Sequence, residues 1–436
     1  MADLMMSTVS MHQKNSAFAE WRTLRRWSKA MKEFRLLIVR PIAIVYCYVE
    51  YFFMVLCQYR ALKAAEYVYP LWFWSFGHQA TDPHMLALRF HGKKLLVLLS
   101  DYRDFNHPIV DAFRPHLTIV DFHHVWRLRC LKALEITRIQ CRVLRFVLAF
   151  LRRRTVVVTT IFETLATPME GYYLTEYIDL LSTSEPSVVQ APTEHIQSFT
   201  EILKRTYPAL AERWFVSLYF RKKRIGENEV RDMNPATYVD AIQLVCKNGG
   251  WVFCGGDFDS DDVLPGMDNV LTYQDFPCDR ALCDLYFLTQ CRFLVCGQSG
   301  PLAIAIAFAT PTLVMNAALY YICGCRSNQR IHYKKLTERS TGRVLRAQEI
   351  FSLPTLCFSS NKQFNRAGLL HVDNTSADIA TGVDDMLALC LSQKDSTQSV
   401  EYQELFQRYH ALLPVGSMVE ETPCKPTFSY LRSLQF

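Results

Sequence analysis

The sequence predicts an α/β protein with two domains, each built around a parallel sheet. At 436 residues the chain exceeds the size of one ordinary hydrophobic core. Half of the residues are apolar and 21% are charged, which argues against bulk disorder. Short apolar runs alternate with amphipathic stretches, and this rhythm is typical of repeated strand–helix–strand units.

The first domain is predicted to span residues 61–205. Strands are expected at 68–74, 94–100, 117–120 and 156–159. Helices are expected to begin at Asp82-Pro83, which offer N-cap and N1 chemistry, and to cover 108–113 and 125–151. A stretch rich in Ser, Thr and Pro at 182–192 marks the approach to a domain boundary.

The second domain is predicted to span residues 206–390. Strands are expected at 214–220, 251–254, 270–273, 292–296 and 311–315. Helices are expected at 235–247, closed by Gly249-Gly250, at 281–290 and at 300–309. The tail at 391–436 is expected to pack back on the N-terminal domain through apolar residues at helical spacing, namely Tyr402, Leu405, Phe406 and Tyr409.

Residues 1–60 are predicted to form a basic amphipathic leader, with nine Lys/Arg against four Asp/Glu. The run Pro41–Cys57 is apolar apart from Glu50, but it is shorter than the roughly 20 residues that span a bilayer. We interpret it as a helix that lies in the membrane interface. A membrane-spanning helix and a buried core helix remain as alternatives.

A second basic block covers Trp126–Arg154, with nine Arg/Lys against Glu135 alone. Both blocks suit an anionic partner such as lipid headgroups or nucleic acid, although a solvated helix face explains either one alone. No nucleic-acid-binding motif is recognisable, so we expect a membrane surface and no nucleic acid as partner. The 15 Cys lack zinc-binding spacing, and no secretory signal opens the chain. The protein is therefore expected in the cytoplasm, at the inner face of the cell membrane.

The segment Phe293–Asn316 carries the clearest chemical signal. A buried strand ends in a glycine turn, and Ser299-Gly300-Pro301 then open a helix. A helix N-terminus presents unpaired N–H groups and a positive dipole end, so it can hold a phosphate. Gly300 would let the phosphate approach the backbone, and Ser299 would donate a hydroxyl. An ordinary tight turn is the alternative reading.

This segment resembles the donor-phosphate segment of GT-B glycosyltransferases, especially the lipopolysaccharide heptosyltransferases. Those enzymes have an acid and a histidine where this chain has Gln298 and Ala303, so heptose specificity is not implied. The resemblance implies a GT-B-like fold, in which two Rossmann-like domains enclose a cleft.

Roughly residues 213–390 are also similar to a family of bacterial glycosyltransferases that is known mainly from sequence and often placed among surface-polysaccharide genes. The matching stretches are 215–221, Arg231, Asn234, Tyr238, 249–252, Gly256-Asp257, Asp284, 291–293, Ser299-Gly300, Asn316, Lys334-Lys335, Gly342, Asp378-Ile379 and 385–387. The N-terminal match is chiefly Gly77-His78. The chain departs from the family at Tyr219, where a His is usual, and at Phe253-Cys254, near which an Arg is usual.

The resemblance implies a nucleotide-sugar as co-substrate, with no other cofactor. Its donor site would comprise Arg221, Asp257, Ser299, Gly300, Pro301, Asn316 and Lys335. Arg221 would follow a central strand, where its guanidinium could fork two phosphate oxygens; a solvated basic loop is the alternative. Lys335 is a second candidate phosphate partner.

For the catalytic base we predict His78, in the first loop of the other domain, because its ordinary pKa near 6.5 suits proton abstraction. A loop histidine bonded locally is the alternative. Asp101 and Asp104, which follow the next strand, are reserve candidates.

The acidic loop after residue 256 places Asp257, Asp259, Asp261 and Asp268 at calcium-loop spacing. Asp262 stands where such a loop needs glycine, so we predict no metal site.

Together these features predict a glycosyltransferase that moves a sugar from a nucleotide-sugar to a glycan or lipid-linked acceptor in cell-surface polysaccharide synthesis, with inversion and without metal. A nucleotide-sugar epimerase of the same fold and a non-catalytic sugar-nucleotide-binding scaffold remain as alternatives.

Overall fold

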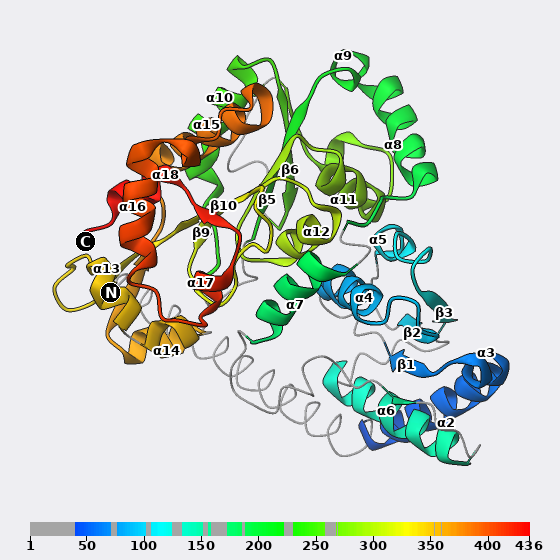
Figure 1. Ribbon diagram of the computed structural model, residues 1–436. Helices are drawn as coiled ribbons and strands as arrows, with labels where there is room; N and C mark the ends of the chain where they lie inside the picture. Colours follow the sequence, from blue (N-terminus) through cyan, green and yellow to red (C-terminus); the bar gives the residue numbers. More distant parts are fainter. Residues whose placement is uncertain are drawn as a thin grey trace, which may run out of the picture.

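The chain folds into two α/β domains, each built around a sheet whose paired strands all run parallel (Figure 1). The computed structural model describes residues 40–70, 76–101, 106–123, 133–150, 156–157, 172–184, 188–221, 230–257, 267, 269–352, 354–358 and 360–436. The fold class predicted from the alternation of apolar and amphipathic segments is confirmed.

The N-terminal sheet has four strands in the order β3-β2-β1-β4. Their bounds are β1 Tyr67–Pro70, β2 Leu95–Asp101, β3 Thr118–His123 and β4 Val156–Val157. β2 is almost wholly apolar because both of its faces are covered. Leu96 and Leu98 belong to the core on one side of the sheet, and Val97 and Leu99 to the core on the other. The strand order reverses between β1 and β4, which makes the segment after β1 a natural ligand position.

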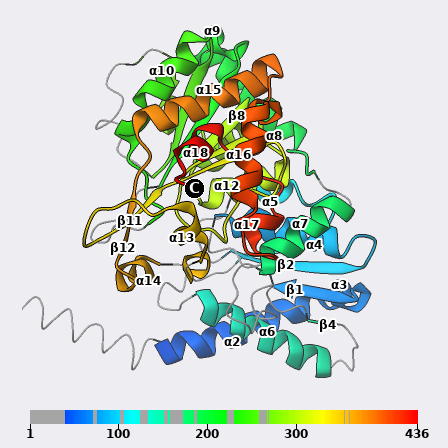
Figure 2. The same cartoon turned by 60° about the vertical axis from the view of Figure 1, so that its left-hand side comes forward.

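Helices cover both faces of this sheet (Figures 1 and 2). On the side of the C-terminal domain lie α4 His78–Arg89, α5 His107–Asp111 and α7 Tyr172–Thr183. On the other side lie α2 Arg40–Cys57, α3 Tyr59–Ala64 and α6 Ala133–Phe150.

The inner face of α2 is part of the core of the N-terminal domain. Cys47, Tyr51 and Val55 are fully buried and pack with apolar residues of α6 and the sheet. The domain boundary expected at residue 61 therefore falls inside this layer. Within the described ranges, no helix is both long enough and apolar enough to span a membrane.

The C-terminal sheet has seven strands in the order β13-β10-β9-β8-β5-β6-β7. Their bounds are β5 Phe215–Phe220, β6 Trp251–Gly256, β7 Val270–Leu271, β8 Phe293–Cys296, β9 Thr312–Ala317, β10 Gln329–Tyr333 and β13 Lys425–Pro426. From β7 to β10 this is the order of a doubly wound sheet, and it reverses between β5 and β8. Ligands bind such sheets outside the carboxyl ends of the two strands that flank the reversal.

The remaining elements surround this sheet. The 3-10 helix at Pro235–Tyr238, α10 Val239–Lys247 and α15 Ser376–Ser392 contribute to the core on one face. The core on the other face contains α8 Thr193–Thr206, α11 Arg280–Thr289 and α12 Gly300–Phe308. Further elements are α9 Pro208–Ala211, α13 Ala347–Ser352, α14 Asn361–Arg366 and the antiparallel pair β11 Lys335–Glu338 and β12 Leu369–Val372.

Two segments, α8 and the tail, pack on the C-terminal domain. α8 packs on α11, where Phe199 stacks on Tyr286 with ring centroids 4.4 Å apart. By this contact α8, which the prediction assigned to the first domain, shares its core with the second. In the tail, β13 joins the C-terminal sheet beside β10, and α18 Phe428–Ser433 packs on α15 and α16 Val400–His410. The tail meets the N-terminal domain through α17 Met418–Glu421, which contacts α7.

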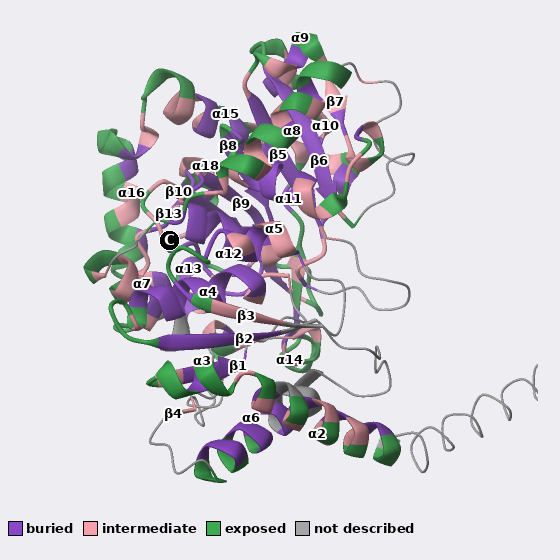
Figure 3. Ribbon diagram, turned by 90° about the vertical axis from the view of Figure 1, so that its right-hand side faces the viewer, coloured by how far each residue is buried: buried purple, intermediate pink, exposed green. Residues whose placement is uncertain are grey.

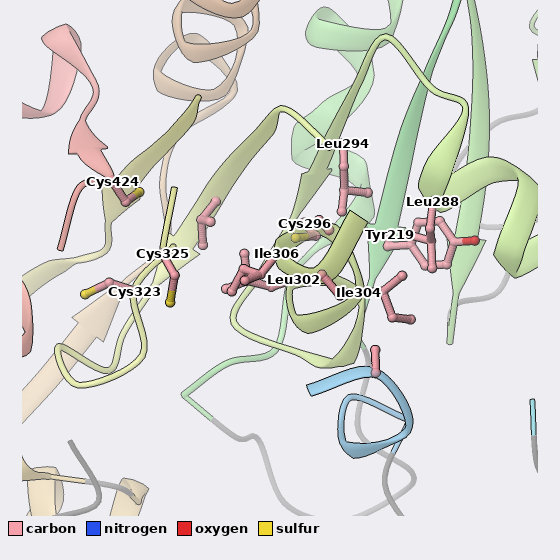
Figure 4. Close-up of a cluster of buried hydrophobic side chains, with 14 of the residues drawn as sticks. Tyr219, Leu288, Leu294, Cys296, Leu302, Ile304, Ile306, Cys323, Cys325 and Cys424 are labelled. Atoms are coloured by element: carbon pink, nitrogen blue, oxygen red, sulfur yellow. The ribbon is translucent and has the colours of Figure 1, made fainter. Parts of the chain in front are cut away.

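α12 joins the two domains. Leu302 and Ile306 lie on one side of the helix and Ile304 on the other, and all three are buried (Figure 4). A helix that is apolar all round belongs in a core. Here the reason is that α12 lies between the C-terminal sheet and α4 of the N-terminal domain.

Candidate functional site

The carboxyl edges of the two sheets meet where α12 begins. β8 ends at Cys296, and the chain turns through Gly297 and Ser299 into the helix. A β-carbon placed on Gly300 would lie 2.9 Å from the backbone nitrogen of Gly77 and 2.8 Å from Cδ1 of Phe76. The loop after β1 therefore abuts the first turn of α12, and the ligand-binding edges of the two domains come together.

This contact changes the role expected for Gly300. The sequence led us to expect a phosphate beside its backbone, but Phe76 and Gly77 occupy that space. Pro301, the next residue, is buried. Ser299 is the N-cap of α12, yet its hydroxyl makes no capping bond and instead lies 3.4 Å from the carbonyl oxygen of Gly297.

Arg221 directly follows β5, on the other side of the strand reversal. Its side chain is 28% exposed, and its Nε lies 4.0 Å from Oδ1 of Asp232. The N–H of Met233 donates to the carbonyl oxygen of Arg221 at 3.0 Å. A β-carbon on Gly297 would lie 2.8 Å from Sδ of Met233. Arg221 and the turn before α12 are thus linked through one short segment.

Lys334, and not Lys335, reaches the carboxyl edge of the C-terminal sheet near Arg221. Lys334 follows β10 and is buried; its Nζ donates to the carbonyl oxygen of Asp232 at 3.0 Å and lies 2.7 Å from Oδ1 of Asp373. Adjacent residues of an extended chain point to opposite sides. Lys335 lies near His332 on the other side. Burial lowers the pKa of His332, the charge of Asp378 opposes this lowering, and the charge of Lys335 adds to it.

Asp257 follows β6, and its N–H donates to the carbonyl oxygen of Phe220 at 3.1 Å, next to Arg221. Its side chain is exposed and lies 3.6 Å from Nη2 of Arg280. That guanidinium also donates to the carbonyl oxygen of Gly256 and sits 4.4 Å from the ring centre of Tyr273.

Asp284 of α11 is a buried carboxylate beside this group that the sequence analysis gave no role. Its Oδ1 accepts hydrogen bonds from the hydroxyls of Tyr219 at 2.9 Å and Tyr273 at 2.5 Å. Burial raises the pKa of Asp284 to about 6, against the lowering effect of Tyr273, Arg280 and Tyr219. Tyr219, which departs from the family pattern, therefore binds the Asp284 carboxylate.

Asn316 lies behind the edge, at the end of β9, in a left-handed backbone conformation with φ of 55°. Its N–H donates to Oδ1 of Asn374 at 2.7 Å, and its own Oδ1 accepts from the N–H of Asn374 at 2.7 Å. Its Nδ2 donates to the hydroxyl of Tyr238 at 3.0 Å. These bonds occupy its amide group, so Asn316 braces the strand end and does not face the edge.

Gln298 also braces the edge, which the sequence analysis did not predict. Its buried Nε2 donates to the carbonyl oxygens of Leu319 and Ile322, both at 2.5 Å. Its Oε1 accepts from the N–H groups of Ala318 and Leu319, both at 2.8 Å. One side chain thus fixes the segment that follows β9.

His78 opens α4 and directly follows Gly77, which abuts the first turn of α12. Its Nδ1 lies 2.9 Å from Oδ1 of Asp82, and Asp82 also accepts from the hydroxyl of Tyr69 at 3.0 Å. Burial disfavours the imidazolium, but the charge and hydrogen bond of Asp82 together outweigh this, so the pKa of His78 is raised. The helix was expected to begin at Asp82-Pro83; it begins four residues earlier because the Asp82 carboxylate binds these two side chains in the core and does not act as a cap.

The remaining candidates contribute less to this arrangement. Asp101 is the last residue of β2, paired with His123 of β3, and the structure does not describe its side chain. Asp104, Asp259, Asp261 and Asp268 lie outside the described residues. Among the side chains that the structure does describe, no group of three or more His, Cys, Asp or Glu is arranged to hold a metal ion.

No model of a known protein family matches the chain, and no curated protein matches it in sequence. Several solved structures share features of its arrangement. A family 9 glycosyl transferase from Veillonella parvula is 10% identical with a TM-score of 0.43, covering 69% of this chain and 95% of its own. ADP-heptose lipopolysaccharide heptosyltransferase II from E. coli is 12% identical with a TM-score of 0.40, covering 61% and 89%. UDP-GlcNAc 2-epimerase from Neisseria meningitidis is 12% identical with a TM-score of 0.34, covering 82% and 96%.

Proposed function

We propose that the chain is a glycosyltransferase that moves a sugar from a nucleotide-sugar donor to a glycan or lipid-linked acceptor in the synthesis of cell-surface polysaccharide. One observation carries the proposal. A histidine oriented by a buried carboxylate stands at the carboxyl edge of one sheet, next to the strand reversal and helix start at the carboxyl edge of the other.

The donor diphosphate is held in the C-terminal domain. Arg221 lies at the strand reversal, where a guanidinium can bind two phosphate oxygens at once. Lys334, buried and paired with Asp373, donates to the carbonyl oxygen of Asp232 and so holds the segment that carries the partner of Arg221. Because Phe76 and Gly77 cover Gly300, the diphosphate binds on the Arg221 side of the turn that contains Ser299. These groups stabilise the negative charge that develops on the leaving diphosphate, and this mechanism needs no metal ion.

His78 acts as the base. Asp82 binds Nδ1 and orients the ring, and the imidazole takes the proton of the acceptor hydroxyl. The acceptor oxygen forms a bond to the anomeric carbon as the bond from that carbon to the diphosphate breaks. The proton passes to His78, the electron pair leaves with the diphosphate, and a single displacement inverts the anomeric configuration.

A thermal-shift screen against UDP, GDP, ADP, CMP and dTDP, with and without divalent metal, tests the donor site. A ligand that binds only the folded state raises the melting temperature. One nucleotide is expected to give a metal-independent shift that Arg221→Gln abolishes. The matched control is Arg366→Gln, an exposed arginine of α14 in the same domain, which should keep the shift. If no nucleotide shifts the wild type, the proposed donor site, and with it the proposal, fails.

A further inference from the structure

The outward face of α2 is apolar along its length. Every side chain that the structure describes as exposed on this helix is apolar, namely Pro41, Ile42, Val45, Val49, Phe53 and Cys57. The four largest of these, Ile42, Val45, Val49 and Phe53, are 50% to 63% exposed. A helix that covers a sheet normally presents polar residues to water on its outer side.

The neighbouring helix α6 extends this surface (Figure 3). Phe146 and Phe150 are 62% and 76% exposed. The ring of Phe52 lies 5.8 Å from that of Phe53 and 6.4 Å from that of Phe146, so the two helices share one continuous apolar surface. We call this surface the α2–α6 outer face and define it by Ile42, Val45, Val49, Phe53, Phe146 and Phe150.

The described charged side chains that are exposed on α2 and α6 are positive. Arg142 and Arg145 are exposed on α6, and Arg60 and Lys63 are exposed on α3. In the sequence, residues 1–39 precede α2 and carry seven Lys/Arg against three Asp/Glu. Among the described exposed side chains of α2 and α6, the charged ones are all arginines. A symmetric contact with a second copy would bring these arginines together, which disfavours self-association.

We propose that the α2–α6 outer face docks on a lipid surface that carries anionic headgroups. The apolar side chains enter the boundary of the acyl region, and the arginines bind headgroup phosphates. The helices lie in the plane of the interface, with their inner sides kept in the core of the domain. This inference goes beyond the transfer reaction and does not depend on it.

Vesicle flotation of the full chain tests the proposal, with phosphatidylcholine alone and with phosphatidylcholine mixed with phosphatidylglycerol. Phe53→Ser and Phe146→Ser should each lower binding to the mixed vesicles about tenfold. The pair Arg142→Gln and Arg145→Gln should lower that binding roughly 25-fold, at about fivefold for each charge. The arginine pair should not change binding to phosphatidylcholine alone.

The matched control replaces Val400 and Val415 by serine, since these residues are 75% and 93% exposed on the C-terminal domain. Binding that is lost in the outer-face variants and kept in this control, with unchanged melting temperatures, supports the proposal. Unchanged vesicle binding in both outer-face sets overturns it. So does a sedimentation experiment in which those variants dissociate an oligomer while vesicle binding stays as in the wild type. The arginine variants change only exposed polar groups, so they should fold even if a phenylalanine variant does not.

Discussion

Replacing Gln298 by glutamate should destabilise the C-terminal domain strongly, because the side-chain amide is buried and bonded on both sides. Its Nε2 donates to two carbonyl oxygens, those of Leu319 and Ile322, and its Oε1 accepts from two N–H groups. A glutamate keeps the acceptor for the N–H groups but sets a carboxylate oxygen against the two carbonyls.

Each unsatisfied buried polar group costs about 1–3 kcal/mol, so the two carbonyls account for about 4 kcal/mol at neutral pH. Burial and the facing carbonyls raise the pKa of the introduced carboxyl above its unfolded value of about 4.3. A raised acid pKa removes stability as the pH rises through the folded value, so the deficit should shrink as the pH falls toward about 5.

The assay is urea unfolding followed by tryptophan fluorescence, at pH about 7 and about 5. Gln290→Glu makes the same substitution at an exposed residue of the same domain and should change the free energy of unfolding by less than about 0.5 kcal/mol. If Gln298→Glu is no less stable than Gln290→Glu at neutral pH, the bracing role assigned to Gln298 is refuted.

Two further substitutions test other parts of the fold by the same unfolding assay. Ala309 ends α12 in a left-handed conformation, with φ of 55°, so Ala309→Gly should stabilise the protein by about 0.5–1 kcal/mol; a loss of stability would contradict this reading. Asp284→Asn keeps an acceptor for both tyrosines and removes a carboxyl whose pKa is raised to about 6. The wild type loses stability as the pH rises through that value, whereas the variant does not. The free energy of unfolding of the variant, relative to the wild type, should therefore increase by about 2–3 kcal/mol from pH 4 to pH 7. A difference between the two proteins that does not change with pH would contradict the raised pKa of Asp284.

The sequence predicted those elements whose signal is local. Buried apolar runs marked β5, β6, β8 and β9, and glycines marked the ends of β6 and β8. The position of Arg221 relative to Ser299 followed from parallel-sheet topology. Elements whose position depends on residues far away in the sequence were harder to predict. β13 is only two residues long and pairs with β10 from the far end of the chain. The buried face of α2 could not be assigned without knowing that α6 packs on it.

The same difference between local and long-range contacts decided which site residues the sequence could predict. Lys334 and Lys335 differ only in the side of the chain on which they lie, and the start of β11 decides this. Gln298 gave no signal, because its bonds go to backbone twenty residues away. The pairing of His78 with Asp82 could have been found, since residues four apart share a helix face. Our placement of the helix start at Asp82-Pro83 hid this relation.

The raised pKa of His78 sets an expectation for the pH dependence of the transfer rate. A base works in its neutral form, so the transfer rate should rise with pH through a value above the ordinary 6.5 of histidine. Asp82→Asn removes the charge that raises this pKa and should move the rise to lower pH. His195 also pairs with an aspartate, because its Nε2 lies 3.3 Å from Oδ2 of Asp111. His195→Ala is therefore the matched control for His78→Ala.

The most direct test is to supply the nucleotide-sugar that the thermal-shift screen selects, with a sugar or lipid-linked acceptor, and to quantify nucleoside diphosphate and new glycosidic product together. We predict equal amounts of the two, a rate that falls about 10²–10⁴-fold in His78→Ala, and no change in His195→Ala. An epimerised nucleotide-sugar without a new glycosidic bond, or a transfer rate that His78→Ala leaves unchanged, would contradict the account.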